Sequence, residues 1–258
     1  MATPSDNQNL QLVTLVAPLQ TTESGSGTFL GLASDGNQYW IKAPNNPQGV
    51  RTLAAEVVVH GIGALIGAPV CRTALVNIPI SMNSLNWWFT PQHKLTGGIG
   101  HGSLNVDSVI VSDEWTTYSA RDNNRARQAQ VFALWDLCMG GDPQWLHDTS
   151  DDYSIWTFDH GFWLGGDGDW SSESLKRVRT SPWQYDLDPS VASAAALRDA
   201  ATAVDALDRD AIRSVTQSVP IEWGIPSSDL SILADMLYLR TDGVAKRLAT
   251  AAKNSSYD

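Results

Sequence analysis

Basic residues are scarce in this sequence, and long apolar runs are missing. Of its 258 residues, 17 are Lys or Arg and 28 are Asp or Glu, which gives a formal net charge of -11. Nucleic-acid binding depends on clustered Lys and Arg, so we expect no nucleic-acid partner. The most apolar stretch, residues 57–70, is shorter than a membrane span and contains His60 and several Gly. We therefore expect no membrane partner either.

Cysteine is equally scarce. Cys71 and Cys138 lie in apolar surroundings and lack the spacing of zinc ligands or of a redox pair. We expect them to be reduced thiols in the core of a cytoplasmic protein. The first residues contain neither the basic nor the apolar part of a signal peptide. No internal repeat is visible, which argues against a solenoid or a propeller.

Apolar and aromatic residues are plentiful by contrast. The hydrophobic share is 43% against 17% charged, and 11 residues are Trp, a composition typical of a folded globular protein. The acidic excess has two interpretations. It can keep the protein in solution, or it can gather ligands for a metal ion, because Asp is concentrated between residues 142 and 169.

The N-terminal part is predicted to be rich in β-strands. Residues 10–19, 27–34 and 37–43 are strand-like, with turn residues between the last two. Residues 52–66 have the apolar spacing of a helix, followed directly by a Gly that can end it. Residues 71–80 are rich in β-branched side chains and predict a further strand.

The rest of the chain is predicted to be mostly helical. Residues 82–126 are interpreted as an ordered passage between two lobes, because they are rich in Trp as well as in Gly and Asn. Residues 125–139 predict a buried helix that Gly140 stops. Residues 152–163 resemble a strand pair, and from Pro189 onward the pattern is that of amphipathic helices.

Two separated segments suggest a phosphate site. Gly25 and Gly27, on either side of Ser26, would let backbone N–H groups approach a phosphate, although a plain hairpin has the same composition. Lys42 can be an edge lysine that extends to solvent, or it can pair with Glu56 early in the following helix. A strand Lys paired with a helix Glu after a Gly-rich hairpin is how kinases hold the phosphates of ATP.

Two aspartates are candidates for chemistry. Asp142 follows the predicted buried helix, where a carboxylate can accept a proton from a hydroxyl nucleophile. Asp159 and His160 interrupt the apolar segment TFDHGFW, and a carboxylate there can hold Mg²⁺ against nucleotide phosphates. Turn formation or helix capping explains either aspartate taken alone.

Residues from about 21 to 164 resemble the HipA-like kinases, a bacterial group related in fold to protein kinases and phosphatidylinositol kinases. The most specific pieces are the Lys-Asn-Pro-Gly-Glu order within residues 42–56 and the FDHG sequence, with support from GGIGHGS and VFALWDLCMGGDPQWL. The resemblance implies a two-lobed α+β fold from a bacterium or a bacteriophage. A tail at residues 1–10 would precede a β-rich nucleotide-binding lobe at 11–81 and a helical lobe at 82–258.

The resemblance also implies a nucleotide site. ATP would bind between the lobes, with Gly25, Ser26 and Gly27 over its phosphates. Lys42 would contact these phosphates, and Glu56 would orient Lys42.

Further roles follow for the base and the metal. The adenine would lie against residues 74–78, with hydrogen bonds near Asn77 and Ile78. Asp142 would be the catalytic base, and Asp159 would hold Mg²⁺ or Mn²⁺. The γ-phosphoryl group would pass to a Ser or Thr hydroxyl of an unidentified protein substrate.

Two positions depart from the family pattern. Pro143 stands where a basic residue is usual, and His147 stands where an Asn usually binds a second metal ion. Imidazole is a poor Mg²⁺ ligand, although Asp148 could replace it after a small loop shift. Slow catalysis, or a pseudokinase that binds nucleotide and a protein partner, are therefore alternatives. A metal-dependent phosphohydrolase that uses His60 and His147 with the nearby aspartates is a third.

Overall fold

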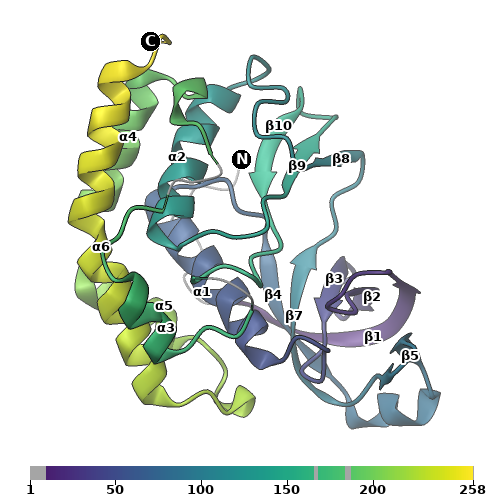
Figure 1. Cartoon of the computed structure of the whole chain (residues 1–258). Coiled ribbons are helices and arrows are strands. Elements are labelled where there is room, and N and C mark those ends of the chain that lie inside the picture. Colours follow the sequence, from purple (N-terminus) through teal and green to yellow (C-terminus); the bar gives the residue numbers. More distant parts are fainter. Residues whose placement is uncertain (1–9, 166–167, 184–186, 258) are drawn as a thin grey trace.

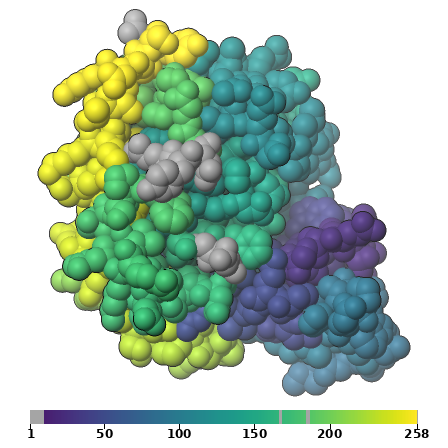
Figure 2. Space-filling view, in the orientation of Figure 1, coloured from purple at the N-terminus to yellow at the C-terminus, as the bar shows by residue number. Residues whose placement is uncertain are grey.

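The computed structural model describes residues 10–165, 168–183 and 187–257, so nearly all of the predicted N-terminal tail lies outside the described residues. The fold is mixed α+β. Helices gather along one side of the molecule and a barrel lies on the other (Figure 1). The space-filling view shows the N-terminal residues, in purple and blue, at one corner and the C-terminal helices on the opposite side (Figure 2). In the described residues, no helix has the length and apolar character needed to cross a bilayer.

Five strands close into the barrel. Its order is β1-β2-β3-β7-β4, with β1 and β4 parallel and the other neighbours antiparallel. Alternate residues, Phe29, Ile41 and Val76 among them, fill the barrel interior. The four strands predicted before residue 81 are confirmed. Their bounds and that of the fifth strand are β1 Leu12–Thr21, β2 Phe29–Ala33, β3 Gln38–Lys42, β4 Thr73–Ile78 and β7 Gly98–Leu104.

Strand β7 departs from the predicted division of the chain. Although it lies beyond residue 82, it pairs with β3 on one edge and with β4 on the other. The barrel therefore extends to Leu104, and the chain leaves it only at Asn105. A boundary after residue 81 would remove a central strand of the barrel.

Residues between β4 and β7 form a small substructure that packs against the β1–β2 loop. They form η1 (Ile80–Leu85) and the hairpin of β5 (Trp88–Thr90) and β6 (His93–Lys94). A Cβ at Gly27, where φ is +63°, would lie 2.6 Å from the Phe89 ring. Glycine at this position thus lets the β1–β2 loop pack directly on the hairpin.

Helix α1 (Val50–Ile66) crosses from the barrel to the helical part and is buried over most of its length. It ends as predicted, because Gly67 adopts a left-handed conformation with φ +72°. Helix α2 (Asn124–Leu137), also predicted, packs beside it. The second sheet packs against α2, and most of the C-terminal helices pack against α1, α2 or both.

The second sheet has the order β10-β9-β8. It comprises β8 (Val109–Ser112), β9 (Trp145–Asp148) and β10 (Ser154–Thr157). The strand pair predicted at residues 152–163 is correct only in part, because the partner of β10 is β9, and the chain after Thr157 is a loop.

The C-terminal helices pack on α2. Helix α6 contacts α2, α3, α4 and α5. Its buried Arg240 pairs with Asp136 of α2 at 3.2 Å, and Arg247 binds the same carboxylate at 2.7 Å. The bounds of these helices are α3 Ser172–Val178, η2 Pro189–Val191, α4 Ala194–Asp205, α5 Arg209–Gln217, η3 Ile221–Trp223 and α6 Ser227–Asn254.

Candidate active site

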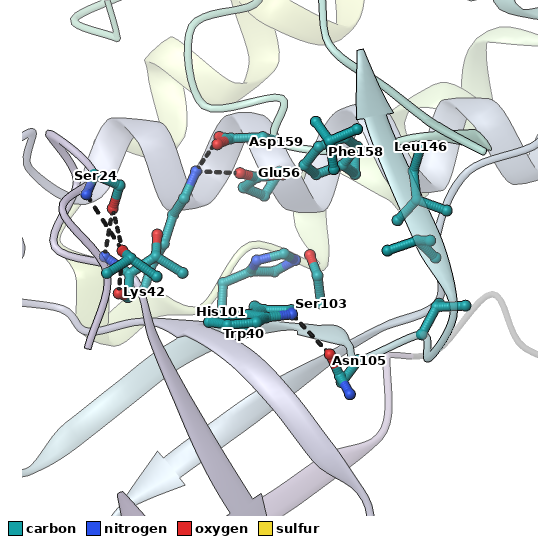
Figure 3. Close-up of a pocket in the computed structure, with 15 residues that line it drawn as sticks. Ser24, Trp40, Lys42, Glu56, His101, Ser103, Asn105, Leu146, Phe158 and Asp159 are labelled. Carbon is teal, nitrogen blue, oxygen red and sulfur yellow. Dashed lines mark hydrogen bonds and ion pairs between the residues drawn. The ribbon is translucent and has the colours of Figure 1, made fainter. Parts of the chain in front are cut away.

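Lys42 lies between two carboxylates. Its Nζ is 2.5 Å from Glu56 Oε1 and 2.5 Å from Asp159 Oδ1 (Figure 3). The side chain is buried, which excludes an edge lysine that extends to solvent. Burial alone lowers the pKa of Lys42, but the two carboxylates outweigh burial and leave the pKa above its ordinary value. The ammonium group is therefore charged.

Glu56 is anchored from both sides. Its Oε2 accepts a hydrogen bond from the backbone N–H of His160 at 2.9 Å. Burial raises the pKa of Glu56, but Lys42 and His160 together hold it well below its usual value. The His160 ring contacts Thr157 Oγ1 through Nε2 at 3.0 Å. The histidine in FDHG thus holds the segment in place beside Glu56.

The loop between β3 and α1 fixes the position of Glu56. Asn46 Nδ2 donates to Ala43 O at 3.0 Å and to Gly49 O at 3.2 Å. Thr52 Oγ1 also donates to Gly49 O, at 2.7 Å. These bonds fix the turn with which the helix begins, and they give a physical reason for the Asn in the motif.

The segment after β10 approaches Lys42 closely. Asp159 has φ +55° and a side chain that is 35% exposed. A Cβ at Gly161 would lie 3.1 Å from Lys42 Nζ and 3.3 Å from Thr52 Cβ. Any larger residue at Gly161 would therefore press on the ammonium group.

These charges occupy one end of a cavity of about 320 Å³, a volume within the usual range of small-molecule sites. Ser24 and Thr28 of the β1–β2 loop line the same cavity, and Figure 3 shows Ser24 beside Lys42. Ser26 is buried within the loop and contacts Thr28 Oγ1 at 2.7 Å. The predicted Gly-rich loop therefore lies at the charged end.

The other end of the cavity is apolar. Leu146 of β9 lies there, on the side of the cavity away from Lys42 (Figure 3). Val106, Val109 and Val111, which follow β7 in the chain, also line the cavity. The cavity therefore has a charged half and an apolar half. Such a site suits a ligand that carries both an ionic group and a flat apolar group.

His101 also lines the cavity. It is buried, and within the described residues its Nε2 has no hydrogen-bond partner. Burial lowers its pKa to about 4, against a weaker opposing effect of Glu56. The ring is therefore neutral near pH 7. Sequence patterns did not single out His101, Ser103 and Asn105, although their i, i+2, i+4 spacing overlaps the GGIGHGS segment.

Asp142 lies outside the residues that line the cavity. It follows α2 with φ +52°, and its Oδ2 accepts a hydrogen bond from Gln144 at 2.9 Å. Its loop is nevertheless joined to the chain after Asp159, because Leu164 N donates to Cys138 O at 3.0 Å. The loops of the two aspartates are thus neighbours, and the role of Asp142 stays a prediction.

The other predicted metal ligands lie elsewhere. His147 alternates along β9 with the cavity residue Leu146, and its buried ring packs on Tyr118 at 5.0 Å between centroids. Asp148 Oδ1 accepts hydrogen bonds from Ser150 in the following turn. Nothing joins either residue to Asp159 in the described part of the chain, where no group of three His, Cys, Asp or Glu could hold a metal ion.

The residues predicted to contact adenine lie away from this cavity. Strand β4 is paired with β1 and β7, and Ile78 faces the barrel interior. Neither Asn77 nor Ile78 lines the cavity, whereas Asn105 and Val106 do. The cavity therefore borders the chain that leaves the barrel and not β4.

The fold that these elements define is that of a kinase. The structure is similar to a Helicobacter pylori proinflammatory kinase, CtkA, with a TM-score of 0.60 and 13% identity over 95% of this chain and 97% of that one. A Golgi casein kinase matches at a TM-score of 0.48 and 11% identity over 96% of this chain and 74% of that one. Its Mn/ADP-bound form matches at 0.40 and 11% identity, over 96% and 72%. The sequence matches no family model and no curated protein.

Proposed function

We propose that this chain is an ATP-dependent, HipA-like kinase with two lobes that transfers the γ-phosphoryl group to a Ser or Thr hydroxyl of a protein. The observation that carries this proposal is Lys42, buried between Glu56 and Asp159 at one end of a cavity whose other end is apolar. Phosphates belong at the charged end and a base at the apolar end.

Lys42 would bind the phosphates as a fixed cation. Because Glu56 is held by His160, it would keep the ammonium group in place when phosphates bind on the partly exposed side, beside Asp159. The loop from Ser24 to Thr28 would cover the phosphates with backbone N–H groups. The base would lie beside Val106, which has no backbone hydrogen bond among the described residues.

The donor set fits a metal ion that arrives with the nucleotide. Mg²⁺ is commonly held by one or two carboxylates together with phosphates and water, and less often by a cage of protein ligands. Asp159 supplies such a carboxylate, with one oxygen on Lys42 and part of the side chain exposed to the cavity. Bound there, Mg²⁺ or Mn²⁺ would neutralise charge on the phosphates.

Asp142 is the proposed base. Its carboxylate would take the proton of the acceptor hydroxyl as that oxygen bonds to the γ-phosphorus, while the bond from the γ-phosphorus to the ADP oxygen breaks. Most of the rate would come from positioning and charge neutralisation by Lys42 and the metal ion.

One observation favours a pseudokinase as the second candidate. The ring of His147 packs on Tyr118, and Asp148 accepts hydrogen bonds within a turn, so neither residue expected at the second metal position lies at the cavity. The phosphohydrolase alternative loses its support for the same reason, because its proposed ligands do not come together.

Transfer of radiolabelled phosphate from ATP separates these candidates. The purified chain is incubated with ATP and Mg²⁺ or Mn²⁺, alone and with generic protein acceptors. A kinase labels itself or an acceptor, and Asp142→Ala binds ATP as wild type does but transfers about 10²–10⁴ times more slowly. ATP binding without labelling would favour the pseudokinase, and no ATP binding would contradict both.

A further inference from the structure

Strands β3 and β7 present one set of side chains to the cavity. In the ladder, Trp40 is opposite Ser103 and Lys42 is opposite His101. Opposite residues and those two apart lie on one face of a sheet, and all four line the cavity. Trp40 and Lys42 are thus separated by about 7 Å along β3, with the indole toward the apolar end and the ammonium at the charged end.

The indole of Trp40 is held in a fixed orientation. Its Nε1 donates to Asn105 Oδ1 at 2.9 Å (Figure 3). Asn105 Nδ2 in turn donates to Asp107 Oδ1 at 3.3 Å. Because the only polar atom of the ring is satisfied at its edge, the ring face is left for an apolar contact. Leu146 and Val109 also line this cavity and supply apolar side chains for such a contact.

We propose that Trp40 is the platform on which the nucleobase stacks, and that Asn105 is a positioning residue that holds the platform. This inference rests on the proposed nucleotide site and names the group that recognises the base. A purine covers more of an indole than a pyrimidine does, so the site selects purine nucleotides. Stacking on an aromatic side chain typically changes affinity by about 10- to 100-fold per base.

Two ligands separate this inference from the proposed function. Calorimetric titration with ATP and Mg²⁺ probes both halves of the cavity, whereas inorganic tripolyphosphate and Mg²⁺ probe only the half around Lys42. Trp40→Ala raises the Kd of ATP about 10- to 100-fold and leaves the Kd of tripolyphosphate unchanged. Trp40→Phe keeps most of the affinity for ATP. Trp88→Ala is the matched control, because Trp88 is 49% exposed on β5 and does not line this cavity.

The other possible outcomes separate a failure of the stacking role from a failure of the nucleotide site. If Trp40→Ala binds ATP as tightly as wild type does, the platform is refuted while the nucleotide site stands. Equal losses for ATP and tripolyphosphate would mean that Trp40 acts only on the shape of the whole site, which also refutes stacking. If wild type binds neither ligand, the proposed function fails first.

A double-mutant cycle tests the role of Asn105. Asn105→Ala raises the Kd of ATP about 3- to 10-fold, the usual effect of one hydrogen bond, without changing the Kd of tripolyphosphate. In the Trp40→Phe background the same substitution has no effect on either Kd, because phenylalanine has no N–H to hold. An equal effect in both backgrounds would refute the positioning role.

Discussion

Among its described residues the molecule has two buried clusters of opposite charges, and they differ in access. Between α2 and α6, Asp136 and Arg240 are both 0% exposed, and Arg240 donates five hydrogen bonds. At the cavity, Lys42 and Glu56 are buried, but the side chain of Asp159 is 35% exposed. The first cluster is closed and structural. The second is open on the side where a ligand can enter.

The difference teaches how to separate stability from function in this chain. A buried charge that loses its only partners is strongly destabilising. A charge at a cavity can take a new partner from the ligand, so its removal harms binding more than folding. Substitutions in the closed cluster should therefore mainly lower the free energy of unfolding. Substitutions in the open cluster should mainly lower the affinity for ATP.

The largest expected effect is on the closed cluster. Asp136→Ala leaves Arg240 without its carboxylate in the core and should lower the free energy of unfolding by about 3–5 kcal/mol. Urea unfolding measures this loss. Asp242→Ala is the control, because its pair with Lys246 is exposed and should contribute about 0.5 kcal/mol or less. A similar loss in both variants would contradict the comparison.

Acid should lower the stability of the protein through buried histidines that interact with Glu56 of the open cluster. Burial lowers the pKa of His60 and of His101 from 6.5 to about 4, although the negative charge of Glu56 partly opposes this effect. Between these pKa values the unfolded chain binds more protons, so the free energy of unfolding falls as the pH falls from 6.5 to about 4. We expect about 1–2 kcal/mol per histidine at pH 5.

The measurement is urea unfolding at pH 7 and at pH 5. His60→Gln removes one of these titrating rings without touching the cavity lining, so it should reduce the difference in stability between the two pH values but not abolish it, because burial also lowers the pKa of His147. A wild-type stability that is constant or rises toward pH 5 would show that the histidines are charged in the folded protein.

Lys42→Met should raise the Kd of ATP about 10- to 100-fold, because it removes a charge-assisted contact with the phosphates. The loss of stability should be smaller than for Asp136→Ala, since Glu56 keeps the N–H of His160 and Asp159 is partly exposed to water. Calorimetry and urea unfolding on the same samples give both quantities. A variant that unfolds as easily as Asp136→Ala would erase the distinction between the clusters.

The smallest effect compares two glycines that lie against the two cations. A Cβ at Gly161 would be 3.1 Å from Lys42 Nζ, and one at Gly243 would be 3.0 Å from Arg247 Nη1. Gly161→Ala should raise the Kd of ATP by roughly 3- to 10-fold, the effect expected of about 1 kcal/mol. Gly243→Ala should leave the Kd unchanged and, as a helix substitution, need not destabilise the fold. Equal changes in the Kd of ATP for the two variants would contradict the distinction between the open and the closed cluster.

Local patterns predicted the first four strands and both central helices, because alternation, apolar spacing and terminal glycines act over short stretches. The order of a strand Lys and a Glu early in the following helix also suggested the pair of Lys42 and Glu56, which 14 positions of sequence separate. Long-range pairing could not be predicted in this way. Strand β7 inserts between β3 and β4, which brings His101 and Asn105 to the cavity, and Asp136 meets Arg240 only when α6 packs on α2.

The most direct test of the account is calorimetric titration of the wild-type chain and of Lys42→Met with ATP and Mg²⁺. The account predicts one saturable site in wild type and an affinity at least about 10-fold lower in the variant. Equal affinity in the two proteins, or no binding to wild type, would contradict the claim that the open cluster is a nucleotide phosphate site.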